Sequence, residues 1–352
     1  MPSPCKRRPF LTFLPEKDQP KYPDHEEVGE LIVTHQQDLI TAIGGSDRAR
    51  RLAELFTRKT VTDPQLSKLI HSSLDMDRLD YLLRDARAAG VPYGQIDLNY
   101  LLNNFRASPT GMLGVSEKAI TAVDHFLLAR FFMHRSVYYH KTTFGLEEAC
   151  RQLLRRGRDQ RKFGIPVDGA AIAELVKSAK LGGFTDAYVD GIVEQASQDD
   201  DPVIKALAES IRRRRPPKLL KEVLVLEQNG KAAHAGAMFK KDCKHELENL
   251  SKHHGLSPGR FLLAETRPLT MEEHGALLTE HQARSLKPAE KQEIIKVFVD
   301  GQQEPVSVVD VPHSIVHLCS NHFFQAFRLY LVRDDATDEN LIATLQKEVA
   351  EW

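Results

Sequence analysis

The chain has 352 residues, of which 41% are hydrophobic and 28% are charged, proportions that are usual for a soluble globular protein. Its 48 lysine and arginine residues balance 49 aspartate and glutamate residues, so the net charge of −1 argues against binding driven by a polyanionic nucleic acid or a membrane surface. The sequence has no apolar run of membrane-spanning length, no secretory signal and no paired cysteine motif, and we therefore expect a cytoplasmic protein with reduced thiols.

The first predicted elements are helices that follow a proline-rich start. Residues 1–23 contain six prolines and are expected to be extended. From His25 to Ile43 apolar residues recur at helical spacing, and Gly44 and Gly45 end this pattern. Ser46 is a capping signal for the next amphipathic helix.

The segment 71–94 predicts a helix with an unusual polar face. Its leucines recur at helical spacing, and Gly90 ends the pattern. Asp77, Tyr81 and Asp85 stand at i, i+4 and i+8, which places two carboxylates and a phenol in one column, with Arg78 beside them. These groups are suited to holding a metal ion and an anionic substrate. The alternative is a solvated face that carries ion pairs between neighbouring turns.

A second motif lies in the proline-free stretch 120–154, which predicts one long helix. Arg130, His134, Tyr138 and Lys141 follow one another at steps of four, four and three, and so share a face. Arginine makes bidentate contacts with phosphate, and lysine adds a compact point charge. The alternative is a basic surface stripe, but the many aromatic residues of this stretch favour burial.

The rest of the chain offers weaker signals. The cluster Arg212 to Arg215 precedes two prolines, which indicates cations at a helix C-terminus or, as the alternative, a nucleotide or nucleic-acid contact. Beyond residue 217 short β runs alternate with helical patterns, which predicts a small α+β domain. His313, His317 and His322 lie close together in the sequence, but their spacing matches no zinc motif, so a metal site is the less favoured interpretation of this cluster.

The two helical motifs resemble those of the HD-superfamily phosphohydrolases, in particular the dNTP triphosphohydrolases. The resemblance rests on SLDMDRLDYLLRDARAAGV and ARFFMHRSVYYHK and extends from about His25 to the C-terminus. It implies a mainly α fold, with an HD-domain-like helical bundle over residues 24–217 followed by the α+β domain over residues 218–352. It also implies a homo-oligomer.

The resemblance assigns roles to particular residues. It implies that Asp77 is the last of four ligands of a divalent metal ion (Mg, Mn, Fe or Zn) and that His25 lies near the scissile phosphate. The implied nucleotide site comprises Arg78, Arg130 and Lys141 as triphosphate contacts, and Tyr81, Asp85, His134 and Tyr138 as the lining of the pocket.

The family's other three metal ligands, a histidine and a His-Asp pair, should precede His25. Residues 1–24 contain no histidine, and Pro9 and Phe10 align with the Pro-Phe that follows this motif in the family. We therefore expect an incomplete metal site, which indicates either a degenerate member or a chain whose start is truncated or misassigned.

Three functions follow as hypotheses. The first is the family reaction, in which a dNTP is cleaved to a deoxynucleoside and triphosphate, with turnover impaired by the incomplete metal site. The second is a catalytically silent subunit that senses nucleotides or pairs with an active relative. The third and weakest is nucleic-acid binding through Arg212 to Arg215.

Overall fold

We describe the fold from a computed structural model of the chain. The structure describes residues 23–57, 69–109, 111–183, 185–228, 231–270, 294–302, 304–319 and 322–352. The predicted extended segment falls outside these ranges apart from Pro23. Along the described residues, no helix has the length and apolar character needed to cross a membrane.

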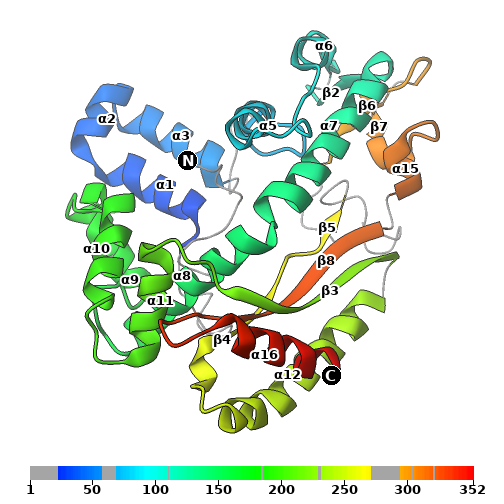
Figure 1. The fold of residues 1–352 in the computed structure, drawn as a ribbon. Helices are drawn as coiled ribbons and strands as arrows, with labels where there is room; N and C mark the ends of the chain where they lie inside the picture. Colours follow the sequence, from blue (N-terminus) through cyan, green and yellow to red (C-terminus); the bar gives the residue numbers. More distant parts are fainter. Residues whose placement is uncertain are drawn as a thin grey trace.

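The described residues fold into a mainly α architecture with two small sheets, which confirms the predicted fold class (Figure 1). One helical group contains the N-terminal elements and the central pair α7 and α8. Its helices are α1 (His25–His35), α2 (Gln37–Ile43), α3 (Ser46–Thr57), α5 (Met76–Ala89), α6 (Leu98–Asn103), α7 (Ile120–Met133), α8 (Lys141–Asp159), α9 (Gly169–Lys177), α10 (Asp186–Ala196) and α11 (Pro202–Arg212).

Side-chain caps determine where several of these helices begin. Asp24 and Glu27 form a reciprocal capping box at the start of α1. The Asp75 carboxylate accepts a hydrogen bond from the backbone N–H of Arg78 at the start of α5. At the other end of α5, Gly90 takes the left-handed conformation with φ of 65°, which a residue with a side chain adopts only at a cost.

The predicted single helix over residues 120–154 is wrong. The structure divides it into α7, a π-helix from His134 to Tyr138, and α8. The N–H of Tyr139 donates to the carbonyl of His134 over 2.7 Å, and His140 then leaves the helical conformation and caps α8. A π-turn widens the helix by one residue, so the spacing rule that placed Lys141 on the face of Arg130 does not apply.

Two sheets complete the fold. The first has the order β1-β2-β6-β7, and the second has the order β3-β8-β4, with β5 also pairing with β8. Strands β6 and β7 pair antiparallel. The strands are β1 (Phe105–Ala107), β2 (Leu113–Ser116), β3 (Lys218–Gln228), β4 (Phe261–Glu265), β5 (Leu269–Thr270), β6 (Lys296–Phe298), β7 (Val306–Ser307) and β8 (His322–Leu331).

Residues from both sides of the predicted boundary at residue 217 share one core. Strand β6 pairs in parallel with β2, and the helix α15 (Ile315–Cys319) is tied to α7 because buried Asp124 accepts hydrogen bonds from Ser314 Oγ and the N–H of Ile315. The largest hydrophobic cluster likewise contains residues from α5, α7, β6 and β8. That the two parts are separate domains stays a prediction.

The central strand β8 is buried on both faces. Alternate residues of the strand point to opposite faces. Phe327, Leu329 and Leu331 pack with α12 (Lys231–His253) and α16 (Glu339–Ala350) on one face. Ala326 and Tyr330 pack toward the helical group on the other face. Gly145 on α8 permits this approach, because a Cβ atom there would lie 3.1 Å from the Tyr330 ring.

Arg328 connects the sheet to the π-helix. Its side chain is buried, and its Nε donates to Glu222 Oε1 on β3 over 2.7 Å. Its Nη1 donates to the carbonyl of Tyr139 over 2.7 Å, and the guanidinium lies 5.4 Å from the centre of the Phe144 ring. Removing a cation from such a buried network leaves Glu222 and a carbonyl without their partner.

We therefore expect Arg328→Met to lower the free energy of unfolding by about 3–5 kcal/mol. Urea denaturation followed by circular dichroism measures this change. The matched control is Arg213→Met, because Arg213 is half exposed and pairs with Glu209 and Asp335 at the surface, where an ion pair contributes about 0–1 kcal/mol. Equal losses in the two variants would show that the buried network of Arg328 contributes no more to the free energy of unfolding than the surface ion pairs of Arg213 do.

Candidate functional site

Four of the sequence-predicted residues meet between α5 and the π-helix. The Tyr138 hydroxyl donates to Asp85 Oδ2 over 2.7 Å. The Tyr138 ring lies 6.4 Å from the Tyr81 ring and 4.9 Å from the His134 ring, both edge to face. We call these four residues, all at most 9% exposed, the Asp85–Tyr138 cluster.

Local helix geometry brings the cluster together. Tyr81 and Asp85 are one turn apart on α5 and both are buried, whereas Asp77, one turn before Tyr81, is exposed. His134 and Tyr138 open and close the π-helix, a conformation that is often found at functional sites. Arg130 lies one turn before His134 on α7 and is 2% exposed, which places a buried cation on the same helical segment.

The structure gives Arg78 protein partners of its own. It is buried and forms an ion pair with Asp75, whose Oδ2 lies 2.9 Å from Arg78 Nη1. The same nitrogen donates to the carbonyl of Ser72. In this conformation Arg78 therefore anchors the start of α5, and a role in contacting phosphate stays a prediction.

The other three predicted residues lie at the surface. His25 and Asp77 are exposed in the first turns of α1 and α5, and Glu26 Oε1 of α1 lies 3.5 Å from Nδ1 of His71, which precedes α5. Lys141 is exposed as the first residue of α8, and its carbonyl accepts a hydrogen bond from the buried Tyr330 hydroxyl. It therefore does not share the buried face of Arg130.

Asp77 by itself does not fit a catalytic metal ion. Among the residues that the structure describes, only His253, His254 and Glu348 form a group of three convergent metal-ligating side chains. Affinity for a divalent ion depends on the number and charge of its ligands, so one exposed carboxylate holds such an ion weakly.

The histidines near the C-terminus do not converge on a metal ion in this part of the structure. His317 Nδ1 lies 2.6 Å from the carbonyl of Val309, and His313 lies 3.6 Å from Glu117. His322 is the first residue of β8. Among the described residues, these three histidines belong to no group of convergent metal-ligating side chains.

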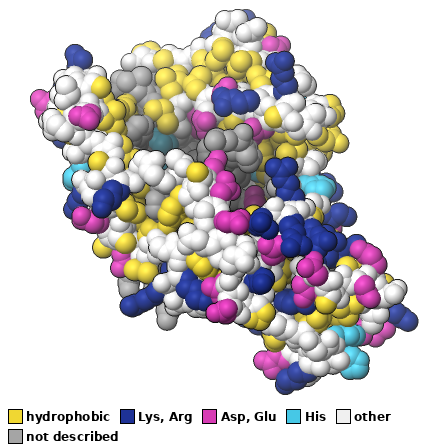
Figure 2. All heavy atoms as spheres, turned by 60° about the vertical axis from the view of Figure 1, so that its left-hand side comes forward, with side chains coloured by type: hydrophobic (Ala, Val, Ile, Leu, Met, Phe, Trp, Pro, Cys, Tyr) yellow, Lys and Arg dark blue, Asp and Glu magenta, His cyan; other side chains and the backbone are white. Residues whose placement is uncertain are grey.

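The basic cluster near residue 213 has acidic partners within the chain. Arg212 pairs with Glu194 and Glu209, while Arg213 and Arg215 pair with Asp335. Lysine and arginine side chains are also interspersed with aspartate and glutamate side chains over the face drawn in Figure 2. These pairings favour the interpretation as helix-terminal cations over a nucleic-acid contact.

Burial makes two of the cysteines unreactive. Burial raises the pKa of Cys150 and of Cys243 to about 11, so both thiols are protonated at neutral pH. A protonated thiol is neither a nucleophile nor a metal ligand. Together with Cys319 they are free of disulfides, as expected.

Sequence reasoning missed several residues that shape the site. Asp75 pairs with Arg78, and Arg328 holds the carbonyl of Tyr139 at the end of the π-helix. Asp75 can be recognised from the sequence as an N-cap residue. Arg328 cannot, because it is 189 residues from its partner Tyr139 and no local sequence pattern predicts their contact.

Comparison with known proteins places the chain in a family. A family profile described as the HD associated region matches residues 96–292, more than half of the chain. The chain belongs to this HD-associated family. This confirms the predicted link to the HD superfamily, whereas membership of the dNTP triphosphohydrolases stays a prediction.

Relatives of this HD-associated protein are found in bacteria and archaea. It is 25% identical over 272 residues to the uncharacterized protein YwfO of Bacillus subtilis, a match that covers 73% of this chain and 60% of YwfO. It is 40% identical over 78 residues to an uncharacterized protein of Methanocaldococcus jannaschii, covering 21% of this chain and 17% of the relative. The chain thus spans less than two thirds of either relative.

Two solved structures share the fold. A phosphohydrolase from Bacteroides thetaiotaomicron matches 89% of this chain and 77% of its own, with a TM-score of 0.57 and 18% identity. A hypothetical protein from Aquifex aeolicus matches 99% of this chain and 76% of its own, with a TM-score of 0.63 and 18% identity. At this identity the HD-associated chain shares their architecture.

We expect Tyr138→Phe to lower the free energy of unfolding by about 1–3 kcal/mol, because it leaves the buried Asp85 carboxylate without one hydrogen-bond donor. Urea denaturation measures the loss. Tyr188→Phe is the control, since the Tyr188 hydroxyl donates to the carbonyl of Gly164 at the surface and should cost less than about 1 kcal/mol. No loss in Tyr138→Phe would contradict a tight Asp85–Tyr138 hydrogen bond.

Proposed function

We propose that this chain binds a nucleoside triphosphate, a dNTP, at the Asp85–Tyr138 cluster and that it is the nucleotide-binding part of an HD-type phosphohydrolase. The observation that carries the proposal is the buried hydrogen bond between Asp85 and Tyr138 beside an imidazole. Small-molecule sites are mostly apolar and contain a few convergent polar groups, and the cluster has this character.

Each group of the cluster suits one part of a nucleotide. The Asp85 carboxylate accepts a hydrogen bond from Tyr138 and is able to accept one from a sugar hydroxyl instead. The rings of Tyr81 and Tyr138 offer flat walls for the sugar or base. Arg130 has the charge and the planar fork that bind phosphate oxygens.

The start of α8 supports a position for the phosphate chain. Lys141 is the exposed first residue of this 19-residue helix, so its ammonium group adds to the positive end of the helix dipole. Because Lys141 follows Tyr138 by three residues, a ligand that contacts both would extend from the cluster toward the surface. The cluster is closed in the structure, and binding requires that Tyr138 moves away from Asp85.

The reaction of an HD-type enzyme depends on a divalent metal ion, which activates water for attack on phosphorus. Asp77 is the residue of this chain that would contribute to such a site, and it does not fit a metal ion without further ligands. The second candidate function is a nucleotide-sensing subunit that binds without turnover. A homo-oligomer stays a prediction in either case.

We expect calorimetry to detect dNTP binding that Arg130→Ala weakens by about ten- to a hundredfold, the usual loss for one charge-assisted hydrogen bond. Because Arg130 is buried, Lys141→Ala is the companion variant, and this exposed substitution should weaken binding without affecting folding. Arg213→Ala is the control and should bind as the unmodified chain does. An equal loss of dNTP affinity in Arg213→Ala would indicate that the nucleotide binds at the basic cluster Arg212 to Arg215 instead.

We also expect no metal-dependent release of triphosphate from dGTP in the presence of Mn²⁺ or Mg²⁺, because Asp77 belongs to no group of convergent metal-ligating side chains among the described residues. A coupled assay for triphosphate measures this directly. Steady release that Asp77→Ala abolishes would contradict the expectation and restore the enzymatic function to this chain.

A further inference from the structure

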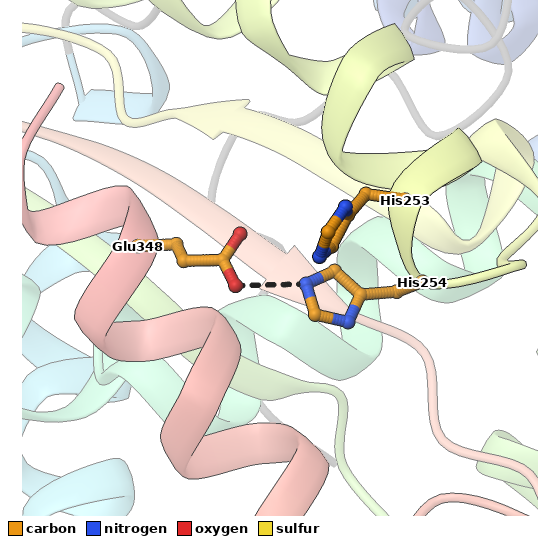
Figure 3. Close-up of side chains that lie close together, drawn as sticks. All are labelled: His253, His254 and Glu348. Carbon is orange, nitrogen blue, oxygen red and sulfur yellow. Dashed lines mark hydrogen bonds and ion pairs between the residues drawn. The ribbon is translucent and has the colours of Figure 1, made fainter.

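The C-terminal helix α16 and the end of α12 meet at a group of three metal-ligating side chains. His253 is the last residue of α12, His254 follows it directly, and Glu348 lies on α16. Figure 3 shows the two imidazole rings and the carboxylate facing one another across the gap between these helices. We propose that these three residues bind a divalent transition-metal ion, with zinc as the best match, and that the ion joins α12 to α16.

The distances suit a shared ion. The ligand atoms of the three side chains all lie within 4.8 Å of one another, and His254 Nε2 lies 2.9 Å from Glu348 Oε1. The rings of His253 and His254 are 4.8 Å apart and nearly perpendicular. A tetrahedral zinc ion with ligands at about 2.0–2.1 Å separates them by about 3.4 Å, a spacing that small side-chain rotations reach from here.

The two adjacent histidines lie at the C-terminal end of α12. His253 is the last residue of the helix, and the N–H of His254 still donates to the carbonyl of Leu250 over 3.2 Å. Gly255 then takes the left-handed conformation with φ of 61° and ends the helix. The side-chain conformations of the two histidines, and not a turn of the backbone between them, therefore bring their rings together.

Rigid packing holds the ligands in place. Leu250 on α12 and Leu345 and Val349 on α16 belong to the same buried cluster, which fixes the two helices beside the ligand-bearing residues. Sites carried by packed helices keep their geometry more accurately than sites on loops. The ion would therefore stabilise an existing contact and would not have to create one.

The donor set identifies the class of ion. Two neutral imidazoles and one carboxylate form a zinc-type set that leaves a fourth position for water. Imidazole also suits nickel, copper and iron, whereas magnesium and calcium prefer oxygen ligands. The site lies on α12 and α16, which pack with the face of β8 opposite to the helical group, and it shares no residue with the proposed nucleotide site.

The chain contains a natural control for the site. His245 and Glu246 on the same helix also form a close pair, with Nδ1 and Oε1 2.7 Å apart, but they do not belong to a group of three ligands among the described residues. If a simple His–Glu pair were enough to bind the ion, this pair would bind it as well.

Calorimetric titration of the untagged full chain with Zn²⁺ after treatment with a chelator tests the proposal. We expect one high-affinity site per chain and a rise in the unfolding temperature on addition of Zn²⁺. His254→Ala and Glu348→Gln should each weaken binding by about tenfold or more and remove the thermal shift, since a direct ligand matters at least as much as its supporting residues. His245→Ala should leave both unchanged.

Substitution with Co²⁺ provides a second measurement. A visible absorption band of tetrahedral Co²⁺ that depends on His253 as well as on Glu348 would show that all three residues are ligands. The proposal is overturned if the unmodified chain shows no stoichiometric Zn²⁺ binding. It is also overturned if His253→Ala and Glu348→Gln bind Zn²⁺ as His245→Ala does, because the ion would then be held by other residues among the chain's 15 histidines.

Discussion

The burial of β8 on both faces is the constraint on which the rest of the structure depends. One face packs with α12 and α16, and the other packs toward the helical group through residues such as Tyr330. A strand in this position tolerates a charged residue only if its charge is paired and its donors are satisfied. Arg328 meets this condition by bonding to Glu222 and to the carbonyl of Tyr139, and thereby connects the C-terminal sheet to the π-helix.

The candidate nucleotide site depends on this connection. His134 and Tyr138 belong to the π-helix, and Tyr139, the next residue, is held by Arg328. A π-turn is less favourable than a regular turn, so it persists where surrounding contacts stabilise it. The C-terminal part therefore supports the geometry of a site whose named residues all lie in the N-terminal part.

Two separate places in this protein bear on metal binding. The residue that resembles a metal ligand of the HD superfamily, Asp77, is exposed and outside any convergent group among the described residues. The side chains that do converge are at the far side of the sheet, on α12 and α16. A metal ion detected in the purified protein would for this reason not by itself indicate hydrolytic activity.

The sequence by itself determined the mainly α fold, the helix α5 and the shared face of Tyr81 and Asp85, because helical periodicity and capping are local properties of the chain. It also carried the resemblance that the HD-associated match confirms. Tertiary structure alone decided that the helical stretch becomes a π-helix at His134, that Arg328 bonds to the carbonyl of Tyr139, and that Glu348 meets His254. These features depend on packing and on partners far apart in the sequence, and periodicity contains no information about such partners.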